Sequence, residues 1–123
     1  MKIRIKGDSI RFRLTKTEVE TLCKKGYIEE ITHLGSQPFK YAVTRKSIES
    51  MDIQYEDHTI LLGISDKKIQ GWESNETVGF ETTLAVDADN NAHLLLEKDF
   101  VCLDERIEDQ SDNYPNPKML SEQ

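Results

Sequence analysis

The sequence predicts an α+β fold: a largely antiparallel eight-stranded sheet or barrel with two helices, built from a duplicated β-β-α-β-β unit. Three observations lead to this prediction. Short segments alternate between apolar and polar residues as strands do, one segment carries the capping signals of a helix, and the pattern of the first half recurs about fifty residues later. The repeats would span about residues 2–46 and 52–99 of a single domain over residues 1–103.

The first unit begins with two amphipathic strands, at residues 2–6 and 10–14. Apolar and basic side chains alternate in both, so one face should be buried and the opposite face basic. The residues expected on the buried side are Ile3, Ile5, Ile10, Phe12 and Leu14. The intervening residues 7–9, Gly-Asp-Ser, favour a tight turn, so the two strands should pair as a hairpin.

A helix is predicted at about residues 16–25. Thr15 and Glu18 have the spacing of a capping box, in which each side chain accepts a hydrogen bond from the other residue's backbone amide. Gly26 can end the helix in the left-handed conformation. Cys23 falls on the apolar stripe, so we expect it to be buried and reduced.

The remaining elements follow the same order. Strands are predicted at residues 27–34 and 39–44, joined by a turn at 35–38. In the second unit, Ile53 matches Ile3 at an offset of fifty, and a second helix would occupy residues 66–73. Two amphipathic hairpins would also match in part through periodicity alone, so this remains the alternative to a true duplication.

Charge is distributed unevenly along the chain, whose net charge is −7. Residues 1–51 hold eleven Lys or Arg against six Asp or Glu, a balance of +5, whereas the later residues have a balance of −12. This polarity argues against nucleic-acid binding over the whole surface and allows a local anion site. No apolar segment is long enough to span a membrane and no secretion signal is recognisable, so a cytoplasmic location is expected. Residues 104–123 form a predicted acidic tail.

The candidate site is a basic strand face. Its members, which should meet when the first hairpin forms, are Lys2, Arg4, Lys6, Arg11 and Arg13. Like charges on neighbouring strands repel, so the cluster would be stabilised by a phosphate, a carboxylate or an acidic protein segment. The alternative is a solvated face that acidic side chains on adjacent strands neutralise.

Other motifs that carry chemistry are missing from the sequence. The three histidines have no partnered nucleophile, and no glycine-rich phosphate loop is present. Asp87 to Asn91 lacks the glycine and closing glutamate of a calcium loop, so it is interpreted as a hairpin turn. Cys102 lies beside acidic residues that disfavour the thiolate. We therefore predict no catalytic residues, no metal site and no cofactor.

Two resemblances add to these inferences. The segments KIRIKGDSIRFRLTKTEVE, LLLEKDFVCLDER and DNYPNP resemble a family of small uncharacterised bacterial proteins without an assigned activity. That resemblance covers nearly the whole chain and implies a bacterial cytoplasmic origin, but no site residues. The strand count and basic alternate positions are also similar to those of the triphosphate tunnel (CYTH) phosphohydrolases, whose eight-stranded antiparallel barrels are built from two repeated halves.

The second resemblance departs from its family at the metal site. Those enzymes open with a Glu-x-Glu-x-Lys strand that supplies metal-binding carboxylates, and in this chain only Lys6 fits that pattern. Glu81 or Glu97 would have to supply the carboxylates instead. The main hypothesis is therefore a non-enzymatic binding domain for an anionic ligand or an acidic protein segment. The alternatives are a tunnel-type, metal-dependent triphosphate phosphohydrolase, and a module whose acidic tail folds back on the basic face.

Overall fold

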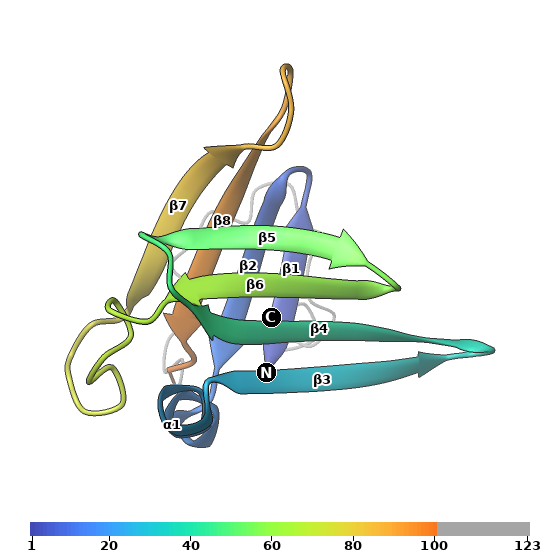
Figure 1. Ribbon diagram of the computed structural model, residues 1–123. Coiled ribbons are helices and arrows are strands. Elements are labelled where there is room, and N and C mark those ends of the chain that lie inside the picture. Colours follow the sequence, from blue (N-terminus) through green and yellow to red (C-terminus); the bar gives the residue numbers. More distant parts are fainter. Residues whose placement is uncertain (101–123) are drawn as a thin grey trace, which may run out of the picture.

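A computed structural model describes residues 1–100 of the chain. These residues form eight strands and one helix (Figure 1). In order they are β1 (Lys2–Lys6), β2 (Ser9–Leu14), α1 (Lys16–Lys25), β3 (Tyr27–Leu34), β4 (Gln37–Lys46), β5 (Met51–Glu56), β6 (Thr59–Ser65), β7 (Gly79–Ala85) and β8 (Asn91–Lys98). The predicted tail at 104–123 and Cys102 lie outside the described residues.

The eight strands form two four-stranded sheets, not one sheet or a barrel. Sheet A has the order β1-β2-β8-β7 and sheet B the order β3-β4-β6-β5. Each sheet consists of two antiparallel hairpins joined by a parallel pair, β2 with β8 and β4 with β6. The predicted single eight-stranded sheet or barrel is therefore wrong. Short turns indicate the antiparallel hairpins correctly, but they carry no information on how one hairpin pairs with another.

Each sheet takes one hairpin from each half of the chain. Sheet A combines β1 and β2 with β7 and β8, and sheet B combines β3 and β4 with β5 and β6. The strands of the two sheets cross rather than run side by side (Figure 1). Between β5 and residue 100 the chain has no counterpart of α1, and the duplication of the sequence stays a prediction.

The second predicted helix, at residues 66–73, is wrong as well. Residues 66–74 form a series of turns, within which Gly71 adopts a left-handed φ of +77°. Ile69 and Trp72 are nevertheless fully buried, and the Trp72 Nε1 donates a hydrogen bond to the Thr77 carbonyl at 2.8 Å. The apolar spacing that suggested a helix instead anchors this irregular segment to the core.

Helix α1 confirms the capping signals. The Thr15 hydroxyl accepts a hydrogen bond from the Glu18 amide at 3.3 Å, and the Glu18 carboxylate accepts one from the Thr15 amide at 2.8 Å. Gly26 ends the helix at a φ of +81°. Cys23 is half-buried rather than buried, and its thiol donates to the Ile69 carbonyl at 3.4 Å. Helix α1 is the single helix within residues 1–100, and it is too short and too polar to cross a membrane.

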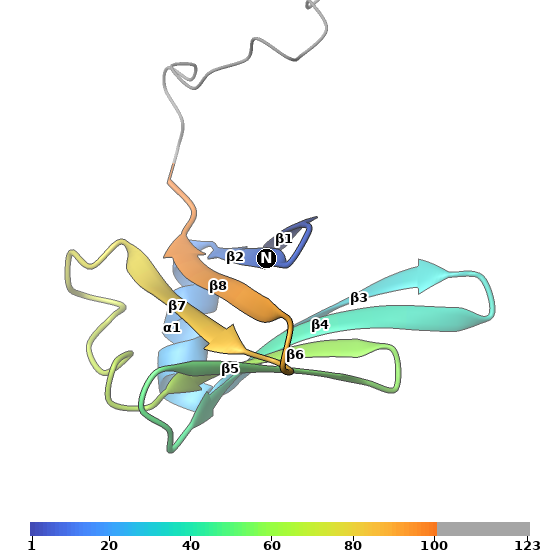
Figure 2. The ribbon, with the colours of Figure 1, turned by 90° about the horizontal axis from the view of Figure 1, so that it is seen from above.

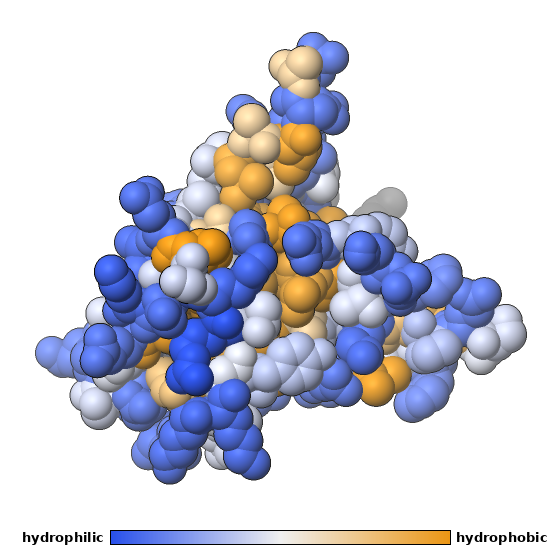
Figure 3. Space-filling view, viewed as in Figure 1, coloured by the Kyte–Doolittle hydropathy of each residue, from blue (hydrophilic) through white to orange (hydrophobic). Residues whose placement is uncertain are grey.

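The core lies between the two sheets and α1. The helix lies at one side of the molecule, between the sheets (Figure 2). Its largest fully buried side chains are Trp72, Phe12, Leu14, Leu22, Leu62, Ile64, Ile69, Leu94 and Leu96. Phe12 and Leu14 are thus buried as predicted, whereas Ile3 and Ile10 are half-buried and Ile5 is 53% exposed. Because the sheets cross, the turn end of β1 extends past the core. Apolar surface is also visible over β7 and β8, above β5 (Figure 3).

Candidate functional site

The β1–β2 hairpin brings the predicted basic residues together. Gly7, at a φ of +56°, is the first central residue of its two-residue turn, the position at which type II′ hairpins require glycine. The resulting register places Arg4 directly opposite Arg11 and Lys2 opposite Arg13. Because alternate residues of β2 are buried, all five basic side chains belong to the outer face of sheet A, away from the core.

A shallow cavity forms at this cluster. Its volume is about 300 Å³, and the residues that line it are Lys2, Ile3, Arg4, Arg11 and Arg13. Four of the five predicted site residues therefore surround one space. The fifth, Lys6, is exposed near the hairpin turn and does not line the cavity. We refer to Lys2, Arg4, Lys6, Arg11 and Arg13 together as the basic face.

Two carboxylates neutralise part of the basic face. Glu97 on β8 forms ion pairs with two arginines: its Oε1 lies 3.6 Å from the Arg11 Nε and 3.5 Å from the Arg13 Nε. Asp99, just after β8, has its Oδ2 3.1 Å from the Lys2 Nζ. The alternative interpretation, in which acidic side chains neutralise the basic face, thus has support for three of its five cations.

The other two cations have no such partner in the described part of the chain. Neither Arg4 nor Lys6 forms an ion pair within residues 1–100. In addition, the Arg11 Nε is buried without a hydrogen-bond partner there, since Glu97 is too distant to accept one. A buried N–H that stays unsatisfied costs about 1–3 kcal/mol, so an added acceptor oxygen would be favoured at this position.

The half of the same face that β7 and β8 supply carries two carboxylates and an imidazole rather than Lys or Arg side chains. The His93 Nε2 lies 3.3 Å from the Glu81 Oε2, and the His93 Nδ1 is hydrogen-bonded to the Thr83 hydroxyl at 2.8 Å. Glu81 and Glu97 lie on this face as diagonal neighbours, since Glu97 pairs with Gly79. However, a cationic or titratable side chain engages each of them, and residues 1–100 hold no group of three His, Cys, Asp or Glu side chains arranged for a metal.

Sequence reasoning missed the partners from β8. His93, Leu95 and Glu97 alternate along β8 at the same two-residue period as the basic residues, which is the signal that could have placed them on one face. Their position beside β2 depends on a parallel pairing between residues about eighty positions apart. No local feature of the sequence specifies that pairing.

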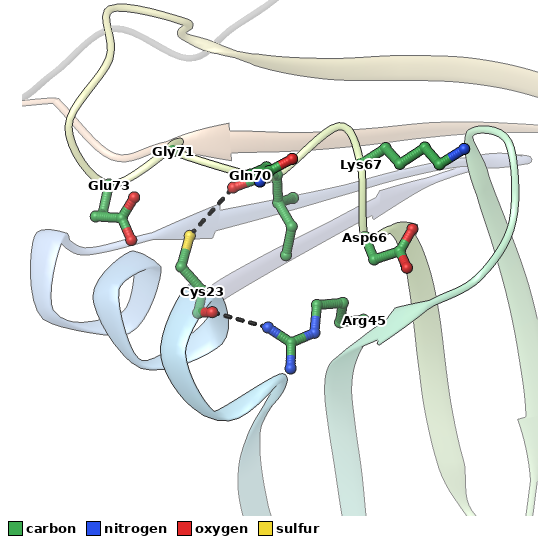
Figure 4. Close-up of a pocket in the computed structure, with 8 residues that line it drawn as sticks. Cys23, Arg45, Asp66, Lys67, Gln70, Gly71 and Glu73 are labelled. Carbon is green, nitrogen blue, oxygen red and sulfur yellow. Dashed lines mark hydrogen bonds between the residues drawn. The ribbon is translucent and has the colours of Figure 1, made fainter.

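A second cavity, of about 570 Å³, lies beside the C-terminal end of α1 (Figure 4). The Arg45 Nη1 donates to the Cys23 carbonyl at 2.8 Å, so this cation satisfies one of the last helix carbonyls. Burial, together with the negative charge of Glu73, raises the pKa of the Cys23 thiol. The thiol is therefore protonated at neutral pH, which argues against its use as a nucleophile.

Comparison with known proteins identifies a family but no activity. No curated protein and no solved structure matches the chain. No match supports the similarity to the triphosphate tunnel phosphohydrolases. The expected membership of a family without an assigned activity is confirmed, because a family model covers residues 1–118. The chain belongs to the family of unknown function DUF7009.

Proposed function

We propose that this protein binds a small anion with phosphate or carboxylate groups on the basic face of sheet A. The observation that carries the proposal is the direct opposition of Arg4 and Arg11 across the β1–β2 pair, beside a cavity of about 300 Å³. Two guanidinium groups at this spacing repel each other, and a bridging anion would relieve that repulsion. Guanidinium groups also suit such ligands because they bind carboxylate and phosphate oxygens in pairs.

The local charge supports the same function. The basic face holds five cationic side chains, three of which pair with the carboxylates of Glu97 and Asp99, which leaves a local balance of +3. The surrounding surface is open to water, so dissolved salt should screen the attraction. At 0.1 M ionic strength little of it should remain beyond about 10 Å. Affinity for an anion should therefore fall as salt is added.

A hydrolytic function has less support. The tunnel-type phosphohydrolase hypothesis depended on a closed barrel with basic residues inside, whereas here the sheets are separate and the basic face is on the outside. Glu81 and Glu97, which that hypothesis assigned to a metal, are engaged by His93 and by the arginines. A binding domain for an anion, without turnover, is the simpler proposal, and a cytoplasmic location remains an expectation from the sequence.

Thermal-shift measurements test the proposal. Inorganic phosphate, tripolyphosphate and citrate are added to the wild type and to Arg4→Gln/Arg11→Gln. A ligand that binds only the folded state, at a concentration about a hundred times its Kd, adds about 2.7 kcal/mol to the free energy of unfolding. The matched control is Lys24→Gln/Lys25→Gln, which removes the same charge from the exposed end of α1. We expect a shift in the wild type and the control, and its loss in the arginine variant. Equal shifts in all three proteins, or none in any, would overturn the proposal.

A further inference from the structure

Strand β1 has a free edge. In sheet A it pairs with β2 alone, and its other edge has no strand partner among residues 1–100. The hairpin turn has two residues, so Lys6 and Ser9 form a hydrogen-bonded pair, and such pairs recur at every second position. The backbone amides and carbonyls of Lys2, Arg4 and Lys6 therefore point to β2. Those of Ile3 and Ile5 point to the free edge.

The inner side of this edge is apolar and incompletely covered. Ile5 is 53% exposed on the inner face of sheet A. Sheet B extends past β1 (Figures 1 and 2), and its inner face presents Tyr41, Ile60 and Tyr55 in one row, of which Tyr55 is 65% exposed. The Tyr41 hydroxyl donates to the Met1 carbonyl at 3.5 Å, so this row begins beside the start of β1. A strand added to β1 would lie over this apolar row.

We propose that the free edge of β1 binds an extended segment of a partner protein as a fifth strand of sheet A. Alternate residues of that segment are acidic and contact Lys2, Arg4 and Lys6 on the outer face. The residues between them are apolar and cover Ile3 and Ile5 on the inner face. The charge part of the proposal rests on the proposed function of the basic face. The backbone pairing does not.

The charge pattern selects this partner over a second copy of the chain. Edge strands invite pairing with other strands, and a β1–β1 pair would set basic side chains against basic side chains on the outer face. An acidic strand turns each of these repulsions into an attraction. The same pattern thus disfavours self-association and favours an acidic partner.

The chain's own acidic tail has the wrong spacing. Its acidic residues nearest to β8 are Asp104, Glu105, Glu108, Asp109 and Asp112. In an extended segment Asp104 and Glu105 would project from opposite faces, as would Glu108 and Asp109. One carboxylate of each pair would therefore meet the apolar inner side. A partner segment with strict alternation fits both faces of β1.

A labelled peptide of about seven residues with alternating Glu and Val probes the proposal by fluorescence anisotropy. Two control peptides separate charge from backbone pairing. One alternates Lys and Val, and the other keeps Glu and Val but carries N-methyl groups on the amides of the edge that would pair with β1. We expect both controls to bind about tenfold more weakly or worse. Equal binding of the N-methylated peptide would overturn the proposal and leave a purely electrostatic contact.

Amide exchange followed by NMR locates the contact on β1. The amides of Ile3 and Ile5 should exchange more slowly when the peptide binds, because they gain partners. The amide of Arg4, which already pairs with β2, is the internal control and should change little. Equal slowing at all three positions, or none at Ile3 and Ile5, would overturn the assignment to the edge.

Two variants of the full chain complete the test. Ile5→Pro removes an outward amide without removing a bond to β2, so it should weaken peptide binding about tenfold while the phosphate response of the basic face persists. If phosphate binds and the peptide does not, the further inference fails alone; if neither binds, the proposed function fails too. In Glu105→Gln/Glu108→Gln/Asp109→Asn, peptide affinity should stay within about twofold. A tenfold gain would overturn the choice of a partner over the tail.

Discussion

Gly79→Ala tests how firmly β8 is held between its neighbours. Gly79 lies on β7 opposite Glu97, and a Cβ at this position would collide with the Leu96 carbonyl oxygen and lie 2.9 Å from the Glu97 Cα. Ordinary contact begins at 3.4 Å, so the Glu97 backbone would have to move by about 0.5 Å. Strand β8 is bonded to β2 on one side and β7 on the other, which leaves it little freedom to move. We expect the free energy of unfolding to fall by about 2 kcal/mol, as overpacking does.

Gly63→Ala is the matched control. A Cβ at Gly63 would collide with the Asp52 Oδ1 and the Lys46 Cδ, which belong to the ends of flexible side chains rather than to backbone. Those ends can turn aside at the cost of the Lys46–Asp52 ion pair, 2.8 Å long, so the loss should stay below about 1 kcal/mol. Urea denaturation followed by circular dichroism measures both variants. Equal losses, or a larger loss for Gly63→Ala, would refute the reasoning from backbone crowding.

Two further predictions concern the helix and the core. Burial acts to raise the pKa of Glu18, but hydrogen bonds from the Met1 ammonium and the Thr15 amide lower it overall from its usual 4.5. Glu18 therefore adds stability that is present above pH 4.5 and lost as the pH falls through its folded pKa. In Glu18→Gln, the free energy of unfolding measured with urea should fall less steeply as the pH is lowered. An unchanged fall at acidic pH would contradict this. Trp72→Ala should lower the free energy of unfolding by about 3–5 kcal/mol, because the indole is fully buried, and a loss below about 1 kcal/mol in the same assay would contradict its central place.

Local sequence features predicted the local structure. The capping box at Thr15 and Glu18 and the glycine at 26 specified α1, because each acts over three or four residues. The strand at residues 2–6 and its turn were equally well specified. The basic face could be predicted for the same reason: its residues lie on two strands that a short turn must pair. The turn, predicted at residues 7–9, is one residue shorter in the structure because Ser9 already pairs with Lys6.

The pairing of hairpins could not be predicted in this way. The two parallel pairs join strands whose residues are distant in the sequence, and many antiparallel hairpins would satisfy the same polar and apolar alternation. The exposure of Ile5 also depends on how the hairpins pair, because that pairing decides where sheet B ends relative to β1. The contacts of Glu97 with the arginines depend on that pairing too, so the basic face was predicted without its counter-charges.

The two sheets treat their outer charges differently, and this contrast bears on function. A strand period of two means that burying Phe12 forces Arg11 and Arg13 outward, so an exposed basic strand alone needs no function. On sheet B, Lys40 pairs with Glu29 at 3.4 Å, and Lys46 pairs with Asp52. On sheet A, Glu97 pairs with Arg11 and Arg13, but Arg4 has no ion pair within residues 1–100.

Gly63 makes the second of those pairs possible. It stands on β6 between the strands of Lys46 and Asp52, and because it has no side chain, the two ends meet across it. Sheet A instead sets Arg4 against Arg11. An opposite-charge pair across the two strands would add about 0.2–1 kcal/mol to the stability of the sheet. Complementary pairs form on both sheets, so the fold has no structural need for two arginines in direct opposition. The repulsion is accounted for if the partner of Arg4 comes from outside the chain.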